Sequence, residues 1–205
     1  IFNSNAVTLG FKRPDGSPVT YNLNTSTYNI NPVVFDTVFN VAGKKVGYFS
    51  MYAFSSVVNS SNQPTPTKTV LDQTFSKFTA AGITNLIVDL RYNGGGAVST
   101  AEYLDNAIAP ASAAGKLMYS TIYNDKLMPE AEGIHLPTIT NFSASTTGLA
   151  LDHVFFITSN NTASASELTL NNLKPYMNVK LVGQKTYGKP VGFIDFNISV
   201  YDKSH

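Results

Sequence analysis

Two apolar runs, each leading into a corner of small residues and then into a helical pattern, constrain the fold of this chain most. The first run is Asn85–Arg91 (NLIVDLR), which leads through Tyr92–Gly96 into a helical pattern over Val98–Ile108. The second is His153–Ile157 (HVFFI), after which small residues precede a helix over residues 164–174. Strands this continuously apolar are typical of parallel sheets buried on both faces. The order of strand, corner and helix therefore predicts an α/β fold.

Further segments extend this pattern in both directions along the chain. Lys45–Phe54 is indicated as a core strand, and Thr69–Ala81 as an amphipathic helix that ends at Gly82. We expect a mostly parallel central sheet with flanking helices. Its expected strands are 45–54, 85–91, 153–158 and 179–182, and the helices expected to cover it are 69–81, 98–108 and 164–174.

The first part of the chain is predicted to be a small β segment. Ala6–Lys12 and Val19–Leu23 are indicated as paired strands joined by a turn at Pro14–Gly16. Residues 33–43 are interpreted as a linker or an edge piece. We therefore expect two regions, residues 1–43 and residues 44–205.

Composition excludes several functional classes. The net charge is +1 without a run of like charges, so nucleic acid is not indicated as a partner. The absence of cysteine removes thiol nucleophiles, disulfides and cysteine-based zinc sites. No apolar run is long enough to span a membrane, and no metal or organic cofactor is indicated. The excess of Asn, Ser and Thr over Lys and Glu favours an extracytoplasmic bacterial protein, and we expect Ile1 to lie within a longer natural chain.

Ser164 is a candidate nucleophile because it stands at a strand-to-helix corner. The first backbone N–H groups of a helix have no intrahelical partner, so they can stabilise an oxyanion beside such a serine. Simpler roles exist for the same residues. Ser164 and Ser166 fit a helix cap and a surface hydroxyl, Glu167 fits a first-turn carboxylate that favours the helix dipole, and Lys189 fits a solvated loop lysine.

The three glycines Gly94–Gly96 form a second candidate feature, since they let the backbone approach another group closely. A plain turn between strand and helix is an equal alternative. A phosphate-binding loop is a third interpretation, but neither Gly-Lys-Ser/Thr nor GxGxxG is present.

A serine nucleophile needs a base, and no histidine is well placed to serve Ser164. His135 lies in a poorly patterned region, His153 begins a strand, and His205 is terminal. Lys189 follows on the next Gly-rich loop, and serine with lysine is a known nucleophile–base pair.

Four segments together resemble the carboxyl-terminal processing (tail-specific) serine peptidase family. They are Lys45–Phe54, Val88–Gly96 (VDLRYNGGG), Thr162–Glu167 (TASASE) and Val182–Lys189 (VGQKTYGK). The resemblance covers roughly residues 44–196. It implies a ClpP/crotonase-like core and a peptidase that cleaves unfolded or C-terminal protein segments without a cofactor. It leaves the oligomeric state open.

The resemblance also implies roles for individual residues. Ser164 would be the nucleophile and Lys189 the general base, with an oxyanion hole formed by the N–H of Ala165 and of Gly95 or Gly96. A PDZ domain is the family's usual companion, and residues 1–32 would be its tail or a joining segment.

One position departs from the family pattern. Many members carry a glutamine four residues after the lysine, whereas this chain has Phe193. Phe193, with Tyr187, Pro190 and Val191, leads us to expect an apolar surrounding in which Lys189 is buried away from water. A non-catalytic peptide-binding relative and a crotonase-like acyl-CoA enzyme are the alternative functions.

Overall fold

The computed structural model describes residues 5–26, 31–145 and 147–193, and the chain divides into two units, residues 1–30 and 31–205. The first unit contains the predicted hairpin, in which β1 (Ala6–Lys12) pairs antiparallel with β2 (Pro18–Asn24). The Asp15 carboxylate accepts hydrogen bonds from the N–H and the hydroxyl of Ser17, which fixes the turn.

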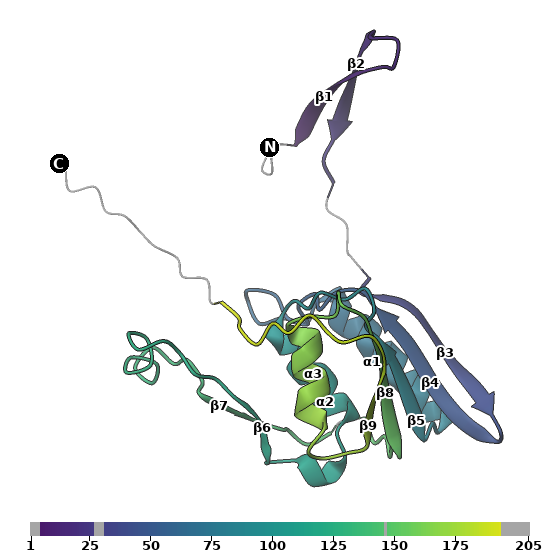
Figure 1. Ribbon diagram of the computed structural model, residues 1–205, viewed down its shortest axis with the longest axis vertical. Helices are drawn as coiled ribbons and strands as arrows, with labels where there is room; N and C mark the ends of the chain where they lie inside the picture. The colour runs from purple at the N-terminus through teal and green to yellow at the C-terminus, as the bar shows by residue number, and fades with distance from the viewer. Residues whose placement is uncertain (1–4, 27–30, 146, 194–205) are drawn as a thin grey trace. The chain divides into compact units, whose positions relative to one another are not determined.

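The second unit is built on one five-stranded sheet with the order β3-β4-β5-β8-β9 (Figure 1). β3 and β4 pair antiparallel, and all the other pairs are parallel. All four predicted strands lie in this sheet, so the α/β fold with a mostly parallel sheet is confirmed. The five strands are β3 (Val33–Val41), β4 (Lys44–Met51), β5 (Asn85–Asp89), β8 (His153–Thr158) and β9 (Val179–Gly183).

The segment interpreted as a linker or an edge piece is the nine-residue edge strand β3. A two-residue turn, Ala42 and Gly43, joins it to β4 with positive φ angles of 49° and 78°. Positive φ at both central residues matches the turn geometry that suits the twist of a hairpin. The turn thus allows β3 to pair with β4 along the edge of the main sheet.

Three helices pack against the sheet: α1 (Pro66–Ala81), α2 (Val98–Ile108) and α3 (Ala165–Leu173). The ring of Phe49 on β4 lies 6.0 Å from that of Phe75 and 6.3 Å from that of Phe78, both on α1. Gly82 ends α1 in the left-handed conformation, as predicted. The buried side chains of the sheet and the three helices form one apolar core.

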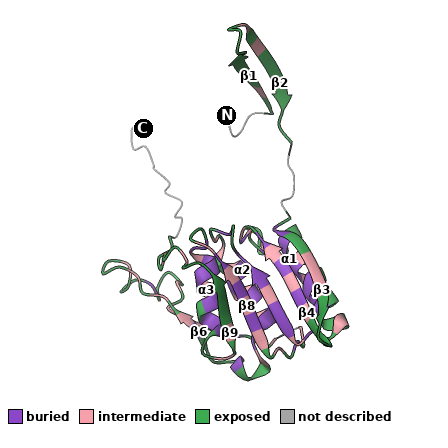
Figure 2. Cartoon of the chain, turned by 45° about the vertical axis from the view of Figure 1, so that its right-hand side comes forward, coloured by how far each residue is buried: buried purple, intermediate pink, exposed green. Residues whose placement is uncertain are grey.

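In the central strands β5 and β8 the apolar side chains on one face are more deeply buried than those on the other, contrary to the expectation drawn from the continuous apolar runs. Leu86, Val88, Val154 and Phe156 are completely buried, whereas the residues alternating with them, such as Phe155, are half-buried (Figure 2). The continuous apolar runs therefore located the strands correctly, but they did not predict how far each face of the sheet is buried.

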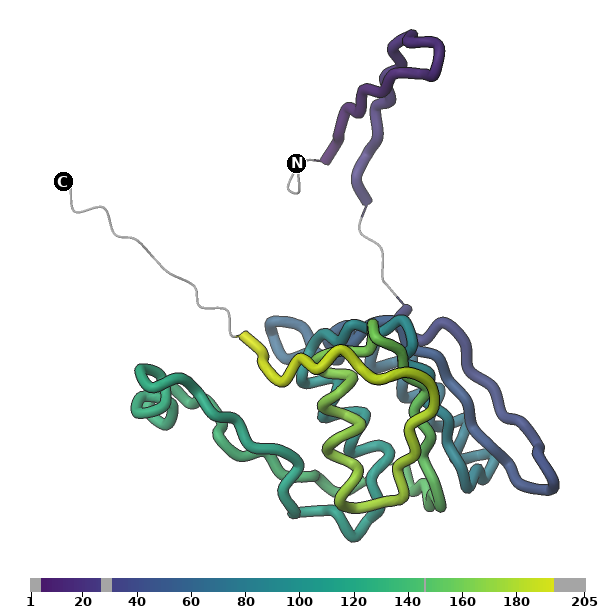
Figure 3. The backbone as a smooth tube through the Cα atoms, in the orientation of Figure 1, coloured from purple at the N-terminus to yellow at the C-terminus, as the bar shows by residue number. Residues whose placement is uncertain are grey.

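The segment that follows α2 includes a small antiparallel hairpin that extends from the sheet and helices (Figure 3). After the short 3-10 helix η1 (Ala111–Ala113), β6 (Leu117–Ser120) pairs antiparallel with β7 (Ile139–Asn141). Tyr176 joins this hairpin to the main body, since its hydroxyl donates to the carbonyl of Leu117 (2.6 Å) and its ring packs on Phe142.

Candidate active site

The loops that follow β5 and β8 lie side by side, because these two parallel strands are neighbours in the sheet. The Thr162 hydroxyl donates to the carbonyl of Leu90 (2.7 Å), and the N–H of Ala163 donates to the carbonyl of Asn93 (3.3 Å). The glycine loop and the serine corner are therefore one structural feature at the carboxyl edge of the sheet, where α/β folds commonly place their sites.

Ser164 has a backbone conformation that is uncommon for a residue with a side chain. Its φ is 58° and its ψ is −120°, and it is the N-cap of α3. Non-glycine residues held at positive φ cost of order 1–3 kcal/mol and cluster at functional sites. A sharp turn between strand and helix that presents a serine is the arrangement of a nucleophile elbow. Ser164 is therefore the N-cap of α3 and also stands at the kind of turn that presents a nucleophile.

Gly95 and Gly96 occupy positions that no other residue would fit. A Cβ built on Gly95 would lie 2.8 Å from the Cβ of Ser164, and one built on Gly96 would lie 2.3 Å from the carbonyl oxygen of Phe54. Both glycines have positive φ angles, 100° and 143°. The glycines thus permit the close approach of the loop to Ser164 that the sequence predicted.

Phe54 explains why β4 ends before the predicted boundary. The chain leaves the sheet after Met51, and the N–H of Phe54 donates to the carbonyl of Gly95 (2.9 Å). The carbonyl of Phe54 in turn accepts from the N–H of Ala97 (2.7 Å). The last predicted residues of the strand hold the glycine loop instead of extending β4.

Some of the backbone N–H groups at this corner already donate a hydrogen bond to a protein group, and others do not. The N–H of Gly95 donates to Asn93 Oδ1 (2.9 Å), and the N–H of Ser164 donates to Glu167 Oε2 (2.9 Å). Within residues 31–145 and 147–193, the N–H groups of Gly96 and Ala165 make no hydrogen bond to another protein group. These two are the donors that remain for an oxyanion.

Glu167 joins the serine corner to the loop that carries Lys189. Besides the N–H of Ser164, its carboxylate accepts the N–H of Lys189 (2.8 Å) and of Gly188 (2.7 Å), and only 8% of the residue is exposed. Burial alone would raise the pKa of Glu167, but hydrogen bonds from the Thr186 side chain and from these N–H groups hold that pKa below its ordinary value. The carboxylate therefore does more than favour the helix dipole. The Ser-x-x-Glu capping-box spacing, residues 164–167, was the available sequence signal.

The Lys189 side chain is directed at Phe193. Its Nζ lies 4.8 Å from the centre of that ring, and in the described part of the chain it makes no hydrogen bond or ion pair. The expectation of an apolar, buried surrounding is wrong, because Tyr187, Val191 and Phe193 are largely exposed, the last at 83%. Lys189 therefore reaches the site through its backbone, with its ammonium group in a cation–π contact.

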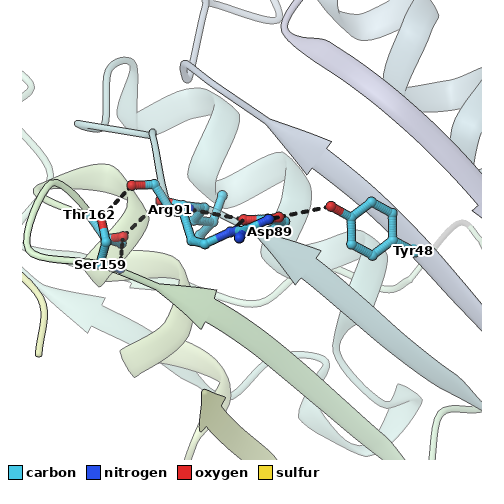
Figure 4. A network of polar contacts seen from close by, with 6 residues as sticks. Tyr48, Asp89, Arg91, Ser159 and Thr162 are labelled. Atoms are coloured by element: carbon cyan, nitrogen blue, oxygen red, sulfur yellow. Dashed lines mark hydrogen bonds and ion pairs between the residues drawn. The ribbon is translucent and has the colours of Figure 1, made fainter. Parts of the chain in front are cut away.

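An ion pair between the buried carboxylate of Asp89 and the half-exposed Arg91 fixes the end of β5 (Figure 4). Arg91 donates from Nε (3.0 and 3.1 Å) and Nη2 (2.6 Å) to the carboxylate of Asp89, which also accepts from the Tyr48 hydroxyl (2.8 Å). Burial opposes ionisation of Asp89, yet the hydrogen bonds from Arg91 and Tyr48 keep its pKa below the ordinary value. The Ser159 hydroxyl donates to the Arg91 carbonyl, so the pair also anchors the loop after β8.

The histidines and acidic residues do not suggest another kind of centre. His153 begins β8, at the end of the strand opposite Ser164, and its ring stacks on Phe155. His205 lies outside the described residues. Among the described residues, no three or more His, Cys, Asp or Glu are grouped to hold a metal ion. Across the same residues, no helix combines the length and apolarity needed to cross a bilayer.

Comparisons with known proteins agree with the resemblance drawn from the sequence motifs. Residues 45–201 match peptidase family S41, although residues 194–201 lie outside the described part. The chloroplastic C-terminal processing peptidase of Tetradesmus obliquus is 26% identical over 194 residues, which cover 90% of this chain and 36% of the relative.

Solved structures give the same result for the fold. A Bacteroides fragilis protein described as an S41 protease matches with a TM-score of 0.72 and 25% identity, over 97% of this chain and 51% of the other. The photosystem II D1 C-terminal processing protease matches with a TM-score of 0.55 and 20% identity, over 90% and 44% of the two chains, and supports the fold alone. The chain thus spans only part of each relative's length.

Proposed function

This chain belongs to peptidase family S41, and from that premise we propose that it is a serine endopeptidase with Ser164 as nucleophile and Lys189 as general base. The observation that carries the proposal is the strained corner at Ser164, which lies against the glycine loop beside two unengaged backbone donors. Its substrate would be an unfolded or C-terminal segment of a protein, since the Tetradesmus relative is named a C-terminal processing peptidase.

In the first half of the reaction, Ser164 Oγ attacks the carbonyl carbon of the scissile peptide bond while neutral Lys189 accepts the hydroxyl proton. The resulting oxyanion accepts hydrogen bonds from two backbone N–H groups. When the C–N bond breaks, the proton passes from Lys189 to the leaving amine, and Ser164 remains as an ester. To act in this way, Nζ must leave the ring of Phe193 and approach Ser164 Oγ.

In the second half, Lys189 takes a proton from a water molecule that attacks the ester. A second tetrahedral intermediate forms and collapses, Ser164 regains its proton, and the acid product leaves. No metal or organic cofactor takes part in either half.

We assign the oxyanion hole to the N–H groups of Ala165 and Gly96. Gly95 was the alternative to Gly96 in the sequence, but its N–H is already bound to the side chain of Asn93. One well-placed donor of this kind contributes about 2.7–4 kcal/mol to transition-state stabilisation.

The proposal extends to the organisation of the protein. Residues 44–205 would form the catalytic region, and residues 1–43 would include the tail of a preceding PDZ-like module. The composition favours an extracytoplasmic bacterial location.

Cleavage of a permanently unfolded protein by the full-length enzyme tests the function. We expect fragments from the wild type and from Ser60→Ala, a control at an exposed loop serine, and none from Ser164→Ala. A fluorophosphonate probe should label Ser164. Binding of the unfolded protein without Ser164-dependent fragments would instead identify a non-catalytic peptide-binding relative.

A further inference from the structure

Asn93 is completely buried between the end of β5 and the glycine loop, and the proposed reaction gives it no role. A buried carboxamide is costly unless its donors and acceptors are satisfied. Asn93 satisfies both, and its partners belong to different segments of the site.

The side chain of Asn93 connects the end of β4 to the glycine loop. Its Nδ2 donates to the carbonyl of Met51 (2.9 Å), while its Oδ1 accepts the N–H of Gly95 (2.9 Å). Its backbone carbonyl accepts from the Ser166 hydroxyl (3.1 Å) and from the N–H of Ala163 (3.3 Å). One residue thus holds β4, the glycine loop and both sides of the Ser164 corner together.

The peptide group between Gly95 and Gly96 is fixed as a consequence. The N–H of Gly95, which belongs to the preceding peptide group, is held by Asn93. The carbonyl of Gly95, which belongs to the peptide group between Gly95 and Gly96, accepts from the N–H of Phe54 (2.9 Å). A trans peptide is planar, and its C=O and N–H point in opposite directions. Since the described residues contain no cis peptide, the N–H of Gly96 points away from Phe54.

We propose that Asn93 is the positioning residue of the oxyanion hole, because its carboxamide removes Gly95 as a donor and orients the N–H of Gly96. This inference rests on the proposed function and deepens it. The role requires a donor and an acceptor on one short side chain, which an ionised aspartate cannot supply because it only accepts. In Asn93→Asp, a carboxylate oxygen would face the carbonyl of Met51.

Asn93→Asp should lower kcat by about 10²-fold, the range seen when an oxyanion donor is removed, and leave KM unchanged. Its affinity for a peptide boronic acid, which forms a tetrahedral adduct with Ser164, should fall by a similar factor. Its affinity for a product peptide should not change. Asn85→Asp is the matched control, because Asn85 is a buried asparagine at the other end of β5, and all four quantities should stay at wild-type values.

The outcomes separate this inference from the function itself. If the wild type shows no Ser164-dependent cleavage, the proposed function fails. If the wild type cleaves and Asn93→Asp keeps its kcat and boronate affinity, the positioning role is wrong and the function stands. A uniform rise in KM with unchanged boronate affinity also contradicts the role.

A crystal structure of the wild-type boronate adduct keeps the proposal testable if Asn93→Asp fails to fold. We expect the boronate oxygen to accept from the N–H groups of Gly96 and Ala165, with the N–H of Gly95 still on Asn93. An oxygen bound by the N–H of Gly95 would overturn the inference.

Discussion

Glu167→Gln tests whether a carboxylate holds the lysine loop at the serine corner. The glutamine has nearly the same shape, but it carries one oxygen where the carboxylate has two. Oε2 accepts the N–H groups of Ser164 and Lys189, and Oε1 accepts that of Gly188 (2.7 Å). If the glutamine oxygen takes the place of Oε2, the glutamine NH₂ group takes the place of Oε1 and faces the N–H of Gly188. Both groups are donors, so at least one hydrogen bond is lost.

The contacts give the size of the effect. A hydrogen bond to a charged group contributes about 1.5–3 kcal/mol, against about 0.5–1.5 kcal/mol for a neutral one. Loss of one bond and weakening of the other two therefore reduces the tether by about 2–4 kcal/mol. Gly188 is exposed, so the loop can open without unfolding the sheet. We expect local opening to become about 30- to 1,000-fold more frequent, since each 1.4 kcal/mol is a factor of ten.

Amide hydrogen exchange at Gly188 and Lys189 measures this opening directly, and cleavage of an unfolded substrate should decline with it. Glu132→Gln, at an exposed glutamate between β6 and β7, is the control and should change neither quantity. Wild-type exchange rates at both amides in Glu167→Gln would show that the carboxylate does not hold the loop. Because the folded pKa of Glu167 is depressed, the tether is present above the ordinary glutamate value of about 4.3 and is lost as the pH falls through the folded pKa.

Three further predictions concern the base, its contact and the core. Lys189→Arg should abolish cleavage as fully as Lys189→Ala, because arginine does not release its proton. The control Lys185→Arg, in the same loop, should stay active. Substantial activity in Lys189→Arg would exclude lysine as the base. Phe193→Gln should raise kcat/KM by up to about fivefold, since it removes a cation–π contact of about 0.5–1 kcal/mol. An unchanged rate would mean that this contact does not keep the Lys189 amine away from Ser164. Asp105→Asn should stabilise the protein by about 1–3 kcal/mol at pH 7 in urea unfolding, and less near pH 4.

The carboxyl group of Asp105 is buried between α2 and α3. Burial raises the pKa of Asp105, the hydrogen bond from Asn172 (2.8 Å) opposes this, and Glu102 adds to it. Its Oδ1 has no hydrogen-bond partner in the described part of the chain. The folded state therefore binds a proton more readily than the unfolded state, and stability falls as the pH rises from the unfolded to the folded pKa. Equal stabilisation at both pH values would contradict this account.

The sequence predicted the elements whose pattern is local. The helix over Val98–Ile108 has the predicted bounds, and the apolar runs identified β5 and β8. Long-range contacts determined the rest. β4 is shorter than predicted because Phe54 bonds to Gly95, which is distant in sequence. Side-chain type alone could not determine whether Lys189 is buried, because burial depends on which segment covers the loop.

The same distinction applies to the candidate site. Motif spacing was enough to nominate Ser164, Lys189 and the glycine loop. It gave no indication that Glu167 accepts N–H groups from a loop about 20 residues away, or that Asn93 connects three segments. Both residues lie within the motif segments, but their hydrogen bonds depend on how β9 and β4 return to this edge of the sheet.

The contacts of the charged groups around Ser164 also favour Lys189 as the general base. Asp89 and Arg91 neutralise each other, and the carboxylate of Glu167 is occupied by backbone N–H groups. Each of these groups holds a loop in place and would lose that contact if it transferred a proton. Among the described residues of this corner, the Lys189 amine is the ionisable group whose only contact is the face of an aromatic ring. A group held so weakly can move to Ser164 without disturbing the loops, which is what a general base in this site requires.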